Sequence, residues 1–105
     1  MTVPRRITVT TFLDDDPAYE AWYVAHHGQY ALNVNPDDAR APGMTTLHCI
    51  PCGHIGREST RLGRRLTRHA KVTGNCADAL WRLAPTFGFP QRACRDCGAR
   101  QVVAS

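Results

Sequence analysis

Four of the five cysteines form two C-x2-C pairs, at residues 49–52 and 94–97, and 41 residues separate the pairs. Cysteine thiolates are preferred ligands of Zn²⁺, and each C-x2-C turn directs two of them at one ion. Gly53 and Gly98 directly follow the pairs, and a glycine leaves the backbone free to turn its amides towards the sulfur atoms. We therefore predict one zinc site. Its predicted ligands are Cys49, Cys52, Cys94 and Cys97.

His48 precedes the first pair and is an alternative fourth ligand, in a site of three sulfur atoms and one imidazole. With four cysteines as the preferred set, the His48 imidazole either donates to a thiolate or packs within its strand. A closed four-thiolate site has neither the open position nor the nearby general base of a catalytic zinc. We therefore expect a structural Zn²⁺ that contributes roughly 10–16 kcal/mol, against a net domain stability of about 5–15 kcal/mol.

The composition predicts a single domain over residues 1–105, with 43% hydrophobic residues to supply a modest core. The first residues lead into an alternating segment rather than an apolar run, and no stretch is long enough to cross a bilayer. An odd number of cysteines fits reduced, metal-bound thiols better than a disulfide framework. We expect a cytoplasmic protein without a membrane partner, and twelve Arg against one Lys indicate a GC-rich bacterial genome.

Alternating segments rich in β-branched residues predict four strands. They cover residues 6–13, 29–34, 44–48 and 66–73. The second and third of these are expected to pair antiparallel across a polar loop. A short helical or irregular basic segment is expected to precede the fourth strand and to end at about Arg65. Residues 101–103 are expected to add a short edge strand or to fray.

Two helices are predicted from their caps and apolar spacing. Asp16 is the expected N-cap of the first, with Pro17 at the first helical position, and Asn75 caps the second, which Pro85 ends. Cys76 lies on the apolar stripe of the second helix, so a buried small side chain is favoured over a ligand. Three aromatic residues of the first helix are expected in the core rather than stacked on bases: Tyr19, Trp22 and Tyr23. The predicted fold is α+β, a small antiparallel sheet with two short helices, clipped by one structural zinc.

The charge of the chain is uneven, with a net −3 over residues 1–56 and a net +7 over residues 57–105. Arg suits phosphate because its guanidinium is a planar fork, and many small modules contact DNA or RNA backbones through a basic segment beside a zinc-held turn. The predicted nucleic-acid contacts are Arg57, Arg61, Arg64, Arg65, Arg68 and Lys71. Two alternatives remain open: these side chains pair with the acidic N-terminal half, or the protein is an adaptor that binds other proteins.

Common catalytic motifs such as H-E-x-x-H, G-x4-G-K and G-x-S-x-G are absent from the sequence. The layout nevertheless resembles the zinc-bound nucleases of the HNH family, which often place a catalytic His between two C-x2-C pairs. This resemblance implies that His69 would be catalytic. The chain departs from the family pattern at Arg68, where an acidic residue is expected, and at Gly98, where Asn is usual. A non-catalytic module is therefore preferred, and a metal-dependent nuclease ranks below the adaptor.

A further set of short motifs covers most of the chain. They are Trp22, Leu32-Asn33-Val34, Leu47-His48 with Cys52 and Ile55, Lys71-Val72, and the pair Cys94 and Cys97. Their order is similar to that of a small actinobacterial domain with a His-x3-Cys motif, a Lys-Val or Lys-Ile strand and a terminal C-x2-C pair. That domain is sometimes attached to nuclease domains. The resemblance implies that His48 and Cys52 are ligands in preference to Cys49, and it implies a role linked to DNA.

Overall fold

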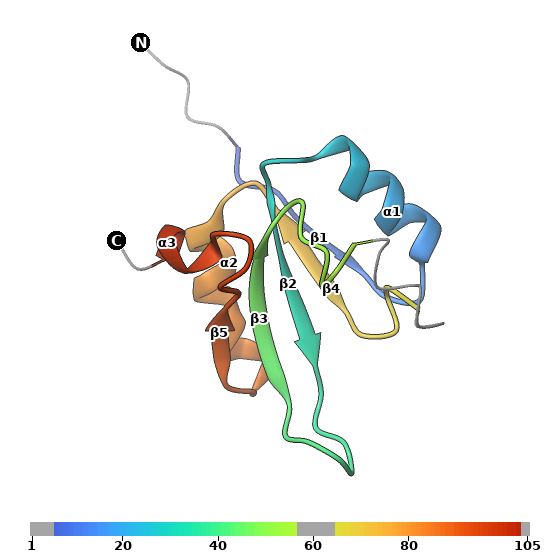
Figure 1. Cartoon of the computed structure of the whole chain (residues 1–105), viewed down its shortest axis with the longest axis vertical. Helices are drawn as coiled ribbons and strands as arrows, with labels where there is room; N and C mark the ends of the chain where they lie inside the picture. The colour runs from blue at the N-terminus through green and yellow to red at the C-terminus, as the bar shows by residue number, and fades with distance from the viewer. Residues whose placement is uncertain (1–5, 57–64, 104–105) are drawn as a thin grey trace.

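Five strands form one mixed sheet in the part of the chain that the computed structural model describes, residues 6–56 and 65–103. The strands are β1 Val9–Phe12, β2 Tyr30–Asn35, β3 Met44–Cys49, β4 Lys71–Gly74 and β5 Gln91–Ala93. Their order across the sheet is β1-β4-β2-β3-β5 (Figure 1). Neighbouring strands are antiparallel except β3 and β5, which are parallel.

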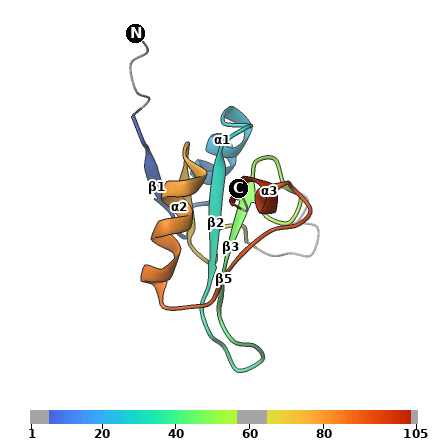
Figure 2. The ribbon, with the colours of Figure 1, turned by 90° about the vertical axis from the view of Figure 1, so that its left-hand side faces the viewer.

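Three α-helices accompany the sheet within the described residues: α1 Asp16–Ala25, α2 Ala77–Leu83 and α3 Ala99–Val103. A short 3-10 helix, η2 Ala84–Phe87, continues α2. Helix α2 packs on one face of the sheet, whereas the loop that follows β3 lies on the opposite side, with α3 near it (Figure 2). None of the described helices has the length and apolar character needed to cross a membrane.

The α+β fold class is confirmed, as is the antiparallel pairing of β2 with β3, but two features of the predicted architecture are corrected. The sheet is not wholly antiparallel, because β5 runs parallel to β3. Residues 101–103 belong to α3 instead of forming an edge strand or fraying. Gly98 directly precedes this helix with a φ of 83°, a conformation that glycine adopts readily, and it turns the chain from the cysteine pair into α3.

The two faces of the sheet differ in their chemistry. Leu32, Leu47 and Val72 are register neighbours on three strands, and these buried residues share a core cluster with Leu80 of α2. Successive residues of a strand point to opposite faces, so the adjacent positions face the loop after β3. There a polar row crosses four strands in register, and its members are Lys71, Asn33, Thr46 and Arg92. One face is therefore a conventional core, and the other carries hydrogen-bonding groups.

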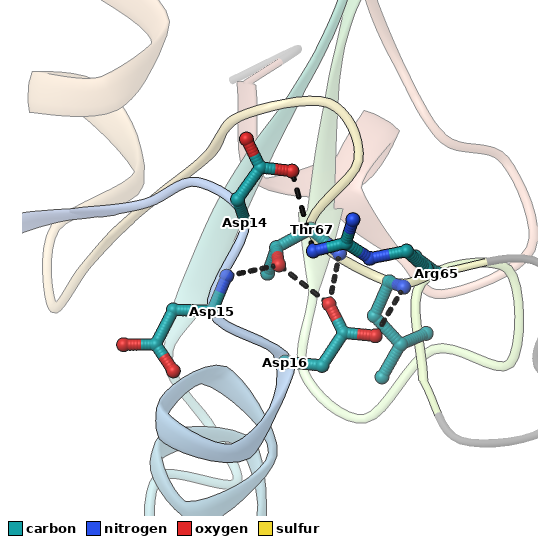
Figure 3. Close-up of polar contacts among 6 residues, drawn as sticks. Asp14, Asp15, Asp16, Arg65 and Thr67 are labelled. Atoms are coloured by element: carbon teal, nitrogen blue, oxygen red, sulfur yellow. Dashed lines mark hydrogen bonds and ion pairs between the residues drawn. The ribbon is translucent and has the colours of Figure 1, made fainter.

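The start of α1 anchors the segment before β4 (Figure 3). Asp15, rather than the predicted Asp16, is the N-cap, and its carboxylate accepts a hydrogen bond from the Ala18 amide at 3.2 Å. The Asp16 carboxylate accepts from the amides of Leu66 at 2.9 Å and Thr67 at 2.8 Å, and also from the Thr67 hydroxyl. Asp16 is therefore not the cap, because its oxygens bind a segment about fifty residues away in sequence.

The second predicted cap is corrected for a similar reason. The N-cap of α2 is Cys76, which makes no side-chain capping bond. The Asn75 side chain instead accepts from the Thr8 amide at 3.0 Å and donates to the Arg6 carbonyl at 2.7 Å, which ties the chain before β1 to the end of β4. Cys76 is half-buried rather than buried, because it precedes the helix instead of lying on its apolar stripe.

The aromatic residues of α1 pack inward, as predicted. Tyr19 is fully buried, while Trp22 and Tyr23 are partly buried and pack against the core cluster. The Phe12 ring of β1 makes an edge contact with Tyr19, with the ring centroids 5.8 Å apart. These side chains hold α1 to the sheet and are not available as a platform for bases.

Candidate metal centre

Four side chains from two distant segments converge beside the loop after β3. They are His48, Cys52, Cys94 and Cys97. One imidazole nitrogen and three sulfur atoms all lie within 4.8 Å of one another. Three thiolates and one imidazole are a common ligand set of closed, four-coordinate metal sites in proteins. The two cysteine pairs thus meet as the sequence predicts, but the cluster has a different fourth member.

His48 is in the cluster, and Cys49 is not one of its four members. His48 pairs with Ala31 in the β2–β3 ladder and shares a face with Thr46 of the polar row, whereas Cys49 is the last residue of β3. Cys49 nevertheless adjoins the cluster, because its amide donates to the Cys97 sulfur at 3.1 Å and its thiol also hydrogen-bonds Cys97. The geometry therefore favours the alternative ligand, His48, over the preferred set of four cysteines.

The environment of His48 fits a neutral imidazole ligand. The residue is 4% exposed, and its Nδ1 is buried without a hydrogen-bond partner among the described residues. Burial, helped by the nearby His54 and Lys71, lowers the pKa of His48 to about 4. The ring is therefore uncharged at neutral pH, which is the form that binds metals. An unpartnered ring nitrogen inside a protein is costly, and a metal ion would satisfy it.

The parallel pairing of β5 with β3 brings the second cysteine pair to the first. Ala93 is the register partner of Leu47, and the next residue, Cys94, donates its amide to the Leu47 carbonyl at 2.8 Å. This places Cys94 beside His48 at the ends of two neighbouring strands. Gly98 then closes the turn in its left-handed conformation, so Cys97 points back at the cluster.

Helix α1 holds the loop that carries Cys52. The Tyr23 hydroxyl accepts from the Cys52 amide at 2.8 Å and lies 3.2 Å from the Cys52 carbonyl, to which it donates. The buried Tyr19 hydroxyl donates to the carbonyl of Ile55 at 2.7 Å. Two tyrosines one helical turn apart therefore fix both ends of residues 52–55, which orients the Cys52 sulfur.

We expect Tyr19→Phe to lower the free energy of unfolding of the metal-loaded protein by about 1–3 kcal/mol, because the buried Ile55 carbonyl loses its donor. Urea unfolding followed by circular dichroism measures this change. Tyr30→Phe is the matched control, because Tyr30 is only partly buried. Equal losses in the two variants would show that the Tyr19 hydroxyl contributes nothing specific.

The thiol of Cys52, one of the three cysteines of the cluster, resists ionisation unless a cation is present. Burial raises the pKa of Cys52 to about 12, although the His54 amide opposes the shift, and the neighbouring Cys97 raises it further. Thiolates are the form that binds a metal, so binding would release protons from these groups. A divalent cation would compensate the charge of the thiolates, which makes the cluster suited to a metal ion.

A second pair of side chains lies at the rim of the cluster. His54 Nε2 and Asp96 Oδ2 are 2.6 Å apart, both residues are exposed, and together with the Cys94 sulfur they form another group of potential metal ligands. Because the two side chains already bind each other in solvent, the pair is explained as a surface contact that links the two cysteine turns. The buried four-residue cluster is the stronger candidate.

The predicted nucleic-acid contacts divide into three groups. Arg57, Arg61 and Arg64 lie outside the described residues. Arg65 and Arg68 are exposed, and Arg65 forms an ion pair with Asp14 at 3.4 Å (Figure 3). Lys71 is only 5% exposed, so its predicted role as a surface phosphate contact is corrected. It lies in β4, where it belongs to the polar row.

Two cavities adjoin each other over the polar row. The first has a volume of about 660 Å³ and the second about 290 Å³, and they share Asn33, Asn35, His54 and Ile55. The cationic side chains of the first are Arg40, Arg65, Arg68 and Lys71. Those of the second are Arg92, Arg95 and Arg100, beside His48 and Cys94 of the cluster. Only one carboxylate lines each cavity in the described part of the chain: Asp38 in the first and Asp96 in the second.

His69, the catalytic residue that the nuclease resemblance implies, lines the first cavity and is half-buried. It belongs to neither group of potential metal ligands found in residues 6–56 and 65–103. No acidic residue of these groups lies beside it. The described residues therefore place no group of three potential metal ligands around His69.

Comparison with protein-family models, with curated proteins and with solved structures finds no match for this chain. The resemblances to the HNH nucleases and to the small actinobacterial domain therefore stay predictions. What the described residues can do follows from the cluster and the adjoining cavities alone.

Proposed function

We propose that this chain is a zinc-stabilised module that binds nucleic acid through the polar face of its sheet, without catalysis of its own. The ligand set of three sulfur atoms and one imidazole is typical of structural zinc sites. A metal ion there would fix the loop after β3 and the turn after β5, which border the two cavities. The metal would therefore hold the binding surface together.

The excess of positive charge around the two adjoining cavities is the main support for this proposal. In the described part of the chain, three exposed Arg side chains line each cavity, against a single Asp in each. Clustered Arg side chains on one face are the electrostatic pattern of a surface that follows a phosphate backbone. The pairing of Arg65 with Asp14 is the alternative to phosphate binding at that position, but both side chains are about 62% exposed, so solvent screens the pair.

Binding that falls steeply with salt is the expected result. Each phosphate contact adds about 0.9 to the slope of log affinity against log salt for duplex DNA, or about 0.7 for a single strand. We expect the double variant Arg68→Gln/Arg92→Gln to reduce this slope by about 1.4 for a single strand and about 1.8 for duplex DNA, and to weaken binding to DNA or RNA. Fluorescence anisotropy at several salt concentrations measures both quantities.

Arg82→Gln is the matched control for this experiment. Arg82 is also exposed but lies on α2, on the far face of the sheet, where it pairs with Asp78 at 3.1 Å. It should leave both the affinity and the salt slope unchanged. The absence of binding to single-stranded and duplex DNA and RNA at low salt, or an equal loss in Arg82→Gln, would contradict the proposal.

A further inference from the structure

Lys71 is a buried cation in the floor of the larger cavity. Its ammonium group lies 2.8 Å from the Asn33 side-chain oxygen, 2.6 Å from the Leu66 carbonyl and 3.5 Å from the His69 carbonyl. All three partners are neutral acceptors. The third contact is long, so one N–H of the ammonium has room for a closer acceptor.

No carboxylate of residues 6–56 or 65–103 forms an ion pair with Lys71. A buried charge without a counter-ion is costly, and proteins usually avoid it unless a partner or a ligand compensates the charge. Burial lowers the pKa of Lys71 to about 8, although the more distant Asp16 acts in the opposite direction. The amine is thus still mostly protonated at neutral pH, and it can donate to an electron-rich group that enters the cavity.

The shape of the cavity indicates the size of such a group. A volume of about 660 Å³ lies within the range of roughly 300–1,000 Å³ typical of small-molecule sites. Lys71 and Asn33 provide a polar floor, His69 lines the wall, and the exposed Arg65 and Arg68 line the cavity nearer the solvent. Donors therefore lie deep in the cavity, while the cations best placed for phosphate lie at its rim. A cavity of this volume can receive one unpaired base, whereas a base pair within an intact duplex cannot enter it.

We propose that the larger cavity receives one unpaired base of the bound strand. This inference rests on the proposed function, since the strand must first bind the basic face. The edge of the base accepts hydrogen bonds from Lys71 and contacts the side-chain amide of Asn33. The imidazole of His69 lies against the base. The sugar-phosphate remains at the rim of the cavity, with Arg65 and Arg68. Imidazole and guanidinium planes commonly stack on unpaired bases, and Lys is a frequent donor to base-edge oxygen and nitrogen atoms.

Three probes of the same sequence test this inference, each made as DNA and as RNA: a fully paired duplex, that duplex with one bulged nucleotide, and the single strand. We expect the bulged duplex to bind about tenfold more tightly than the paired duplex, because hydrogen bonds to the edge of one base typically contribute about this much. Lys71→Met should abolish this preference and leave binding to the paired duplex nearly unchanged. Fluorescence anisotropy gives the affinities, and 2-aminopurine at the bulge reports entry into the cavity by a change in its emission.

The outcomes separate this inference from the proposed function. Equal, salt-dependent binding of paired and bulged duplexes, or a preference that survives in Lys71→Met, would overturn base entry and leave nucleic-acid binding in place. No binding of any probe would overturn both. Should Lys71→Met fail to fold, as judged by metal content and circular dichroism, His69→Ala removes a wall of the same cavity and should reduce the preference at least threefold. Arg82→Gln, on the far face, should retain the full preference.

Discussion

Cys52→Ser is expected to lose the bound metal and to leave at least the half of the chain around the cluster unfolded. Cys52 is one of four mutually close potential ligands, and the residue is buried. A structural zinc contributes roughly 10–16 kcal/mol in small metal-binding peptides, which is comparable to the net stability of about 5–15 kcal/mol of a typical domain. Elemental analysis of the purified protein and its circular dichroism measure the two effects. Removing the metal from the wild type with a chelator should give the same spectrum.

Cys49→Ser is the matched control, because it changes a cysteine of the first C-x2-C pair that is not one of the four clustered residues. Cys49 contacts Cys97 through its backbone amide and through its thiol, and a serine retains the amide and a hydrogen-bonding side chain. We therefore expect this variant to keep one metal ion per chain and to lose less than about 2 kcal/mol of stability, the scale of ordinary point mutations. Loss of metal as complete as in Cys52→Ser would instead support four cysteine ligands.

Asp16→Asn is expected to lower the free energy of unfolding by about 3 kcal/mol. The carboxylate uses both oxygens, one for the Leu66 amide and one for the amide and hydroxyl of Thr67. An asparagine offers a single oxygen and would turn its NH2 group towards one of these donors, and a hydrogen bond to a charged group is worth about 1.5–3 kcal/mol. Chemical denaturation measures the loss. Asp15→Asn is the control, because asparagine caps a helix as well as aspartate does.

The pH dependence of this variant provides a separate test. Burial alone would raise the pKa of Asp16, but the hydrogen bonds from Thr67 and Leu66 hold it below the ordinary value of 3.8. A carboxylate with a lowered pKa stabilises the fold above the pKa of the unfolded chain, and this contribution is lost as the pH falls through the folded pKa. The difference between wild type and Asp16→Asn should thus be constant from about pH 7 to about pH 5 and should shrink only below about pH 4. A difference that already shrinks above pH 5 would mean that Asp16 is not held ionised.

The convergence of the two cysteine pairs on one candidate metal site was predictable from the sequence. C-x2-C spacing is a local property, so two such pairs in a small chain predict that distant segments meet. The choice between His48 and Cys49 depends on which residue of β3 faces the site. The pairing of β3 with its neighbouring strands determines which of its residues face which side of the sheet. Leu47 and His48 are adjacent in β3 and therefore face opposite sides of the sheet, and Leu47 belongs to the core cluster. Counting outward from Leu47 assigns His48 to the opposite face, a signal that the cysteine spacing alone does not contain.

The remaining differences arise from contacts between distant residues. Asp16 and Asn75 have the sequence signature of helix caps, yet both use their side chains to bind other segments. Strand β5 is only three residues long, too short to be predicted from its own sequence, and it forms because it pairs parallel with β3. The sequence predicts Lys71 to be one more surface charge of a basic segment. In the structure its position in β4 directs it to the polar face of the sheet, where it is buried in the floor of a cavity. Local propensity is overridden in each case by tertiary contacts.

The ligand set of the metal is the central claim, and zinc K-edge X-ray absorption of the purified protein tests it most directly. We predict one zinc per chain with three sulfur atoms at about 2.3 Å and one nitrogen at about 2.0–2.1 Å, supplied by Cys52, Cys94, Cys97 and His48. A first shell of four sulfur atoms without nitrogen, or a protein purified without any bound metal, would contradict it.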